Sequence, residues 1–195
     1  MGRRSYTMRA RAEAVAERRE QIFQATYDLF AERPYEEITL QAVADRAAVA
    51  LKTVVRQFGS KANLVTSAAK WGAARESARR EVAPGDVAGA VRVLADRYEQ
   101  MADLVLRRIG VEERIPGLQA AANSARQSHL SWLAAVFAQW LPKRSGPTRS
   151  RRLLALFGAT ELYTYWSWRR RLGASRAEAT AAMRETVDAL LRQWS

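Results

Sequence analysis

The sequence predicts an all-α protein with two domains, an N-terminal three-helix head within residues 1–83 and a larger helical domain at residues 84–195. Ala, Arg, Glu and Leu dominate long stretches at helical spacing, and no run alternates Val, Ile, Thr and aromatic residues as a strand would. Pro84 and Gly85 mark the one strong break between these stretches. The apolar share of 48% in 195 residues is typical of a protein that buries a core.

A basic arm and a long helix open the chain. Arginines at positions 3, 4, 9 and 11 precede a helix whose apolar face follows the i, i+3, i+4, i+7 rule: Ile22, Ala25, Thr26, Leu29 and Phe30. This helix should end before Pro34, because the residue before a proline is pushed out of the α region. The arm has two interpretations, a contact with the DNA minor groove or phosphates and a solvated, disordered end.

Residues 39–58 fit two short helices and a tight turn into twenty positions. Thr39 can cap the first helix, and the small Ala44 allows the second helix to cross it closely. On the second helix Ala50, Val54 and Phe58 share one face and should pack inward. Leu51, Lys52, Val55 and Arg56 lie on the other face, which a helix-turn-helix presents to DNA. Ser60 should cap a fourth helix that runs towards Val82.

Four longer helical stretches are expected in the C-terminal domain. They cover residues 86–108, 118–141 and 150–172, and a last helix from the capping box of Ser175 and Glu178 to Trp194. The third of these has apolar residues on more than one stripe, which predicts a second buried face and hence a contact with another chain.

The composition leaves few parts for an enzyme. The chain has no cysteine and one histidine, His129, and we find no Gly-rich phosphate loop, so we expect no metal site, no cofactor and no enzymatic activity. The net charge of +12 favours a polyanionic partner such as nucleic acid, although the excess is six charges both in residues 1–80 and in the remainder. No membrane span or secretory signal is visible, so a cytoplasmic protein with no membrane partner is the expectation.

The segment ITLQAVADRAAVALKTVVRQFGSKANLV, preceded by IFQATYDLFAERPYEEI, is similar to the DNA-binding region of the tetracycline-repressor (TetR) family. The similarity covers roughly residues 19 to 65. ELYTYWSWRRRLGASRAEATAAMRETVDALL is similar, with less specificity, to that family's regulatory domain. The resemblance implies a homodimeric one-component transcriptional regulator. It would be a repressor, released from a palindromic operator in double-stranded DNA by a small apolar or aromatic effector.

The resemblance also implies individual contacts with DNA. It puts Thr39 and Lys61 on phosphates, Gln41 near a base edge, and Lys52, Thr53 and Gln57 on bases or backbone. The family usually has serine at position 50, glycine at positions 48 and 52, tyrosine at 55 and histidine at 57. These departures affect the expected affinity and operator sequence. The full set of expected DNA-binding residues is Thr39, Gln41, Leu51, Lys52, Thr53, Val55, Arg56, Gln57 and Lys61.

Leu51 and Val55 have two interpretations. Our hypothesis is that they contact thymine methyl groups, while Lys52 or Gln57 hydrogen-bonds to purines. The alternative is that both are core residues. Ala48 is expected to strain the turn if its backbone is left-handed.

In the C-terminal domain the resemblance places an effector pocket among three helices. Its expected lining is Tyr98, Met101, Val105, His129, Trp132, Val136, Tyr163 and Trp166. His129 lies on an apolar stripe, so it is either a core histidine satisfied by a hydrogen bond or a polar anchor in the pocket. The expected dimer interface contains Leu153, Phe157, Thr186, Ala189 and Leu190.

Two other classes of protein are alternatives to a regulator. A helical enzyme could use His129 with Glu161 or a serine, but no nucleophile motif surrounds the histidine. A basic helical DNA-binding or adaptor protein would have no small-molecule ligand. Salt-dependent binding to a palindromic DNA would distinguish a regulator from both. Within the regulator class, an activator stays an alternative to a repressor.

Overall fold

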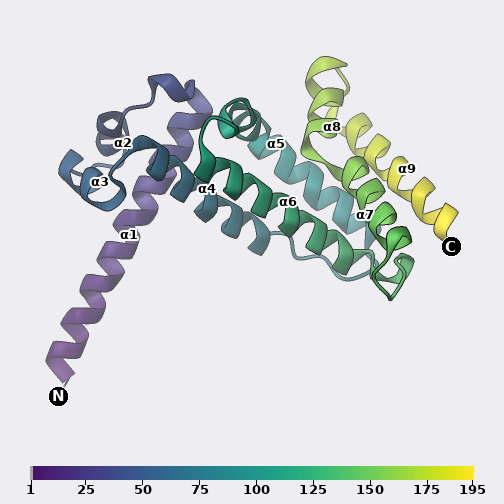
Figure 1. Ribbon diagram of the computed structural model, residues 1–195, viewed down its shortest axis with the longest axis horizontal. Helices are drawn as coiled ribbons and strands as arrows, with labels where there is room; N and C mark the ends of the chain where they lie inside the picture. Colours follow the sequence, from purple (N-terminus) through teal and green to yellow (C-terminus); the bar gives the residue numbers. More distant parts are fainter. Residues whose placement is uncertain (1) are drawn as a thin grey trace. The chain divides into compact units, whose positions relative to one another are not determined.

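The computed structural model describes residues 2–195, with side chains from Ala12 onward except those of Ser77, Arg108 and Pro116. All regular elements in this part of the chain are helical, which confirms the predicted all-α class (Figure 1). The elements are α1 (Gly2–Glu32), η1 (Tyr35–Glu37), α2 (Leu40–Arg46), α3 (Leu51–Phe58), α4 (Lys61–Ala78), α5 (Val87–Glu112), α6 (Pro116–Val136), η2 (Ala138–Trp140), α7 (Pro147–Thr160), α8 (Leu162–Trp166), the π-helical η3 (Ser167–Arg171) and α9 (Arg176–Trp194).

The chain forms two compact units. The head unit contains Met1–Ala73 and Arg107–Ala122, and the body unit contains Ala74–Leu106 and Asn123–Ser195. This division differs from a single boundary at residue 83, because the end of α5 and the start of α6 belong to the head unit. The start of α6 lies close to α4 at Gly117, where a Cβ would lie 2.8 Å from the Thr66 side chain.

The head unit is built around α1. Ile22, Leu29 and Val43 are almost fully buried, and α1 packs against α2. The helix ends at Glu32, just before Pro34, as predicted. The backbone of the expected arm is the first part of α1, while the side chains of its four arginines lie outside the described residues.

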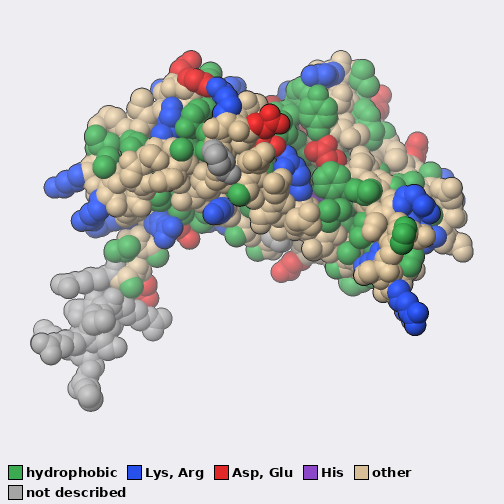
Figure 2. All heavy atoms as spheres, in the orientation of Figure 1, with side chains coloured by type: hydrophobic (Ala, Val, Ile, Leu, Met, Phe, Trp, Pro, Cys, Tyr) green, Lys and Arg blue, Asp and Glu red, His purple; other side chains and the backbone are tan. Residues whose placement is uncertain are grey.

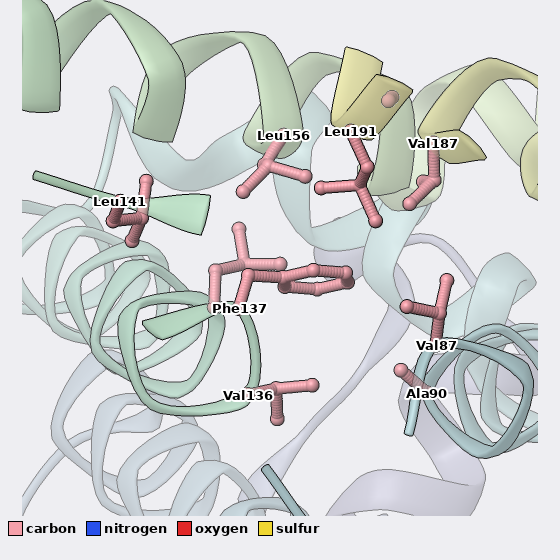
Figure 3. Close-up of a cluster of buried hydrophobic side chains, with 10 residues drawn as sticks. Val87, Ala90, Val136, Phe137, Leu141, Leu156, Val187 and Leu191 are labelled. Atoms are coloured by element: carbon pink, nitrogen blue, oxygen red, sulfur yellow. The ribbon is translucent and has the colours of Figure 1, made fainter. Parts of the chain in front are cut away.

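The core of the body unit surrounds Phe137, whose side chain is completely buried (Figure 3). Val87 and Ala90 of α5, Val136 of α6, Leu156 of α7 and two residues of α9 surround it. A second cluster joins α5, α8 and α9, and its buried members are Val91, Leu94, Ala95, Tyr98, Leu162, Tyr165, Ala179 and Met183. The capping box of Ser175 and Glu178 starts α9 as predicted.

Two of the expected long helices are interrupted. The helix predicted for 118–141 ends at Val136, and the 3-10 turn that follows lets the chain bury both Phe137 and Leu141. The helix predicted for 150–172 starts at Pro147 and breaks at Glu161, whose backbone is extended (φ −77°, ψ 141°). The Glu161 carboxylate accepts hydrogen bonds from the Tyr163 and Thr164 amides and so begins α8.

Smaller differences concern the ends of two helices. The fourth helix was expected to run towards Val82 but ends at Ala78, and the α5 helix extends past the expected residue 108 to Glu112. None of the helices in the described part of the chain has both the length and the apolar character that a membrane crossing requires. The residues with described side chains also contain no group of three or more His, Asp and Glu that could hold a metal ion.

Candidate functional site

The segment α2–turn–α3 has the geometry of a helix-turn-helix. Thr39 caps α2 as predicted, because its Oγ1 accepts a hydrogen bond of 3.0 Å from the Ala42 amide. The turn brings α3 across α2, and the Val49 amide donates to the Ala44 carbonyl at 3.0 Å. Val43 and Ala44 have no exposed surface, so the crossing point is tightly packed.

Ala48 sits in the middle of this turn with a φ of +52°. It is the one non-glycine residue in the described chain with a positive φ. The left-handed region brings Cβ close to the following carbonyl, so this alanine stores strain. The strain expected from the sequence is therefore present in the turn.

The α3 helix is anchored by one face and exposes the other. Val54 is completely buried and Phe58 nearly so, and Phe58 packs against Phe23 of α1 with ring centroids 5.6 Å apart. Leu51 and Val55 are 38% and 44% exposed, so neither is a core residue of the head unit. Ala50, expected to face inward, is exposed, because it precedes the first turn of the helix.

Polar side chains surround this exposed face. Lys52, Arg56 and Gln57 are exposed and Thr53 is half-buried. Figure 2 shows basic and apolar side chains side by side on the surface over α2 and α3. The Gln41 side chain is exposed on α2 and donates to Asp45 at 2.6 Å. The exposed surface thus combines hydrogen-bond donors, positive charge and two aliphatic side chains, which is the mixture that major-groove recognition uses.

Lys61 is held in place by the head unit itself. Its Nζ donates to the backbone carbonyls of Tyr35 (2.8 Å) and Glu36 (3.3 Å) and lies 4.1 Å from the centroid of the Tyr35 ring. A contact with a DNA phosphate would use a proton of the same ammonium group. Ser60 caps α4 as predicted, by accepting from the Asn63 amide at 3.2 Å.

Sequence reasoning missed an ion pair that braces the helix-turn-helix. Arg46, the last residue of α2, donates to both carboxylate oxygens of Glu32, the last residue of α1, at 2.9 and 2.8 Å. This bidentate pair fixes the end of α2 against the end of α1. Fourteen positions separate the two residues, so helical spacing could not reveal the pair.

The sequence and the solved structures of other proteins agree with this geometry. The family described as bacterial regulatory proteins of the tetR family matches residues 22–68. The HTH-type transcriptional repressor KstR of Mycobacterium tuberculosis is 46% identical over 57 residues, which are 29% of this chain and 26% of that protein. KstR of Rhodococcus jostii is 40% identical over 72 residues, 37% of this chain and 34% of that protein. The chain therefore matches about a quarter to a third of these relatives' length.

Similarity of fold extends over most of the chain. A tetR-family transcriptional regulator from Streptomyces coelicolor has a TM-score of 0.70 at 18% identity, with 92% of this chain and 88% of that chain covered. FadR from Bacillus subtilis, solved in complex with stearoyl-CoA, has a TM-score of 0.66 at 17% identity, with 88% and 97% covered. These structures share the helical fold of this chain. The part of the chain that matches this family, residues 22–68, contains the helix-turn-helix described above.

In the body unit the residues expected to line an effector pocket do not share one environment. Tyr98 is buried, and Met101, Val105 and Trp132 pack at the edge of its cluster. Val136 belongs to the Phe137 cluster, and Tyr163 is exposed and stacks on the half-buried Trp166 with centroids 5.7 Å apart. The structure thus brings together Tyr98, Met101, Val105 and Trp132, with Val136 in the neighbouring core and Tyr163 on the surface.

His129 is buried and has hydrogen bonds on both ring nitrogens. Arg80 Nη1 lies 3.0 Å from Nδ1, and Thr160 Oγ1 lies 3.2 Å from Nε2. Because arginine only donates, Nδ1 accepts and the proton of the neutral ring is on Nε2. Burial and the charge of Arg80 lower the pKa of His129 to about 3. The ring is therefore neutral at physiological pH, as the core interpretation requires, and its partners are charged and polar.

The end of α7 before Glu161 provides a hydrogen-bond acceptor for Tyr98. Tyr98 Oη donates a 2.6 Å hydrogen bond to the backbone carbonyl of Thr160, the last residue of α7. This carbonyl is one of those that a helix end leaves without a partner inside the helix. Burial raises the pKa of Tyr98, so the hydroxyl keeps its proton and remains a donor.

The residues expected at a dimer interface lie on α7 and α9, which pack against each other within the body unit. Thr186 and Ala189 are exposed, whereas Leu153, Phe157 and Leu190 are partly buried against the Phe137 cluster. Phe157 also contacts the His129 ring edge-on at 5.4 Å, so part of its surface serves the body's own core. Leu154 on the same helix is 66% exposed and was not among the expected residues.

Proposed function

We propose that this protein is a homodimeric, ligand-responsive transcriptional regulator, a repressor that binds a palindromic operator through α3. The observation that carries the proposal is the division of α3 into a buried face with Val54 and an exposed face with Leu51, Lys52 and Val55. A helix anchored in this way can enter a major groove without losing its own core. The bacterial family supports a place in the cytoplasm, with the chromosome.

Dimerisation supplies the second recognition helix that a palindrome needs. Two such helices must lie roughly 34 to 36 Å apart, one turn of the DNA helix. The exposed Leu154, Thr186 and Ala189 offer an apolar, small-residue surface on α7 and α9, where two helices from each subunit could form a four-helix contact. We place the dimer interface there.

A small molecule bound in the body unit would favour a conformer with lower DNA affinity. The neighbour solved with stearoyl-CoA is a precedent for a ligand on this fold. By linkage, DNA must then weaken ligand binding by the same factor. The expected lining, headed by Tyr98, Met101 and Trp132, is the proposed place of that site.

The test is selection of bound fragments from random double-stranded DNA by the purified protein. We expect a palindromic consensus, and binding that weakens steeply with salt. Fluorescence anisotropy on the selected fragment compares the DNA affinity of the native protein with that of the Arg56→Ala variant and so measures the contribution of α3. Binding to DNA without sequence preference, equal for both proteins, would favour a basic adaptor protein and contradict the proposal.

A further inference from the structure

Two arginines converge on one carboxylate inside the body unit. Arg97 binds both carboxylate oxygens of Glu76, with Nε 2.9 Å from Oε2 and 3.1 Å from Oε1, and Nη2 2.5 Å from Oε2. Arg80 reaches Oε1 with its Nε at 3.2 Å. The three side chains are only 10% to 17% exposed. This Glu76 cluster therefore holds two positive charges and one negative charge out of bulk water.

In the contacts described for this region, neither His129 nor Glu161 is a second anionic partner of the two arginines. His129 accepts from Arg80 and is neutral, because burial and Arg80 lower its pKa. The Glu161 carboxylate acts on the nearby Tyr98, accepts two backbone amides at the start of α8 and lies in the field of Arg126. Burial alone would raise the pKa of Glu76, yet Arg97 and Arg80 outweigh it and lower that pKa, so Glu76 is ionised.

Aromatic rings lie beside the charged cluster. The Trp132 ring stacks on His129 with centroids 5.8 Å apart, and its Nε1 donates to the Arg80 carbonyl at 2.8 Å. Phe157 also meets the His129 ring edge-on. A pair of guanidinium groups next to aromatic walls is suited to a molecule with an acid group at one end and an apolar body at the other.

We propose that Arg80 and Arg97 bind the acid group of an organic anion with an apolar body, which displaces Glu76 and lies against Trp132 and Phe157. The bound acid group accepts the hydrogen bonds that Arg80 and Arg97 now donate to Glu76, so both guanidinium groups keep an anionic partner. Glu76 acts as an internal competitor that weakens the binding of such a ligand. This inference rests on the proposed function, since it names the chemical class of the effector.

Isothermal titration calorimetry of the full chain with sodium decanoate, and with 1-decanol as the neutral probe of equal length, tests the inference. We expect decanoate to bind and decanol to bind at least ten-fold more weakly. Glu76→Gln removes the competitor and should tighten decanoate binding about ten-fold, whereas Arg97→Gln should weaken it about ten-fold, each change equivalent to about 1.4 kcal/mol. Arg169→Gln, which breaks the Glu99–Arg169 pair of the same unit, is the matched control and should change nothing.

A purely structural ion pair would give a different pattern, because both Glu76→Gln and Arg97→Gln would then leave decanoate binding unchanged or weaker. That pattern, equal binding of decanol, or no decanoate binding even by Glu76→Gln, would overturn the inference. Circular dichroism checks folding, and if Arg97→Gln is unfolded the gain expected of Glu76→Gln decides. DNA binding of each ligand-free variant is measured separately. If the protein does not bind DNA but shows the expected decanoate pattern, only the proposed function is contradicted. If it binds DNA but does not show that pattern, only this inference is contradicted.

Discussion

The strain at Ala48 is a local cost that one substitution can remove. Glycine adopts a φ of +52° without the Cβ contact, so Ala48→Gly should raise the free energy of unfolding by about 1 kcal/mol. Urea unfolding followed by circular dichroism measures the change. The control is Ala47→Gly at the neighbouring position, where φ is −83° and glycine only adds flexibility to the unfolded chain. That variant should lose stability, and stabilisation of both variants alike would show that strain is not the cause.

Leu51 and Val55 test how the protein reads sequence. If each covers a thymine methyl group, replacing that thymine by uracil should weaken operator binding by about 0.8 kcal/mol, roughly four-fold, the value of one buried CH₂ group. Leu51→Ala should make the protein insensitive to uracil at the position that Leu51 contacts. Anisotropy titrations of both proteins on both DNAs form a double-mutant cycle. Additive effects at every thymine would contradict the methyl contacts.

At the scale of the element, the caps of two helices are directly comparable. The α3 N-cap is Ala50, which has the extended backbone of a cap (φ −68°, ψ 140°) but no side-chain acceptor. Ala50→Ser should therefore stabilise the head unit by about 1 kcal/mol, since serine can accept an amide of the first turn. The converse change, Ser175→Ala, removes the capping box of α9 and should cost about 1 kcal/mol. Thermal unfolding of both variants checks the opposite signs.

At the scale of the whole molecule, His129 makes stability depend on pH. Its pKa falls from 6.5 to about 3 on folding, so between these values the unfolded chain binds more protons than the folded one. This contribution to stability is complete above pH 6.5 and is lost as the pH falls towards 3. Between pH 6.5 and pH 5 the loss should be about 2 kcal/mol.

The His129→Gln variant separates this effect from other groups. Glutamine can still hydrogen-bond but does not titrate, so its unfolding free energy should fall less than that of the native protein between pH 7 and pH 5. Urea titrations at several pH values give the difference. An identical pH dependence in the two proteins would show that the folded His129 ring is protonated as easily as the unfolded one.

The proposed dimer is also a property of the whole molecule. Ala189→Arg places a charge on the exposed face of α9 and should convert the dimer into a monomer, with loss of palindrome binding and little change in helix content. Sedimentation velocity gives the oligomeric state. Ala181→Arg is the matched control, since Ala181 is exposed on the same helix but faces the groove beside α5. A dimer that survives Ala189→Arg but not Ala181→Arg would move the interface to that groove.

The helical class, the helix-turn-helix and the caps at Thr39, Ser60 and Ser175 could all be predicted from the sequence. These features depend on contacts within about four residues and on the 3.6-residue period, both of which can be read along the chain. The sequence also placed Leu51 and Val55 on a different face of α3 from Val54, but it left open whether they are core residues, and the structure shows that they are exposed.

The breaks in the long helices and the charge pairs inside the body unit could not be predicted from the sequence, because they depend on contacts between distant residues. Local propensity favours an unbroken helix through Glu161. The break is stabilised by the burial of Leu162 and Tyr165. It is also stabilised by the hydrogen bond that Tyr98 Oη donates to the Thr160 carbonyl, 62 positions away. Glu76 and Arg97 are 21 residues apart, so only folding brings them together. The physical reason is common to all these cases: a helical period specifies which face is buried, but not which distant group it is buried against.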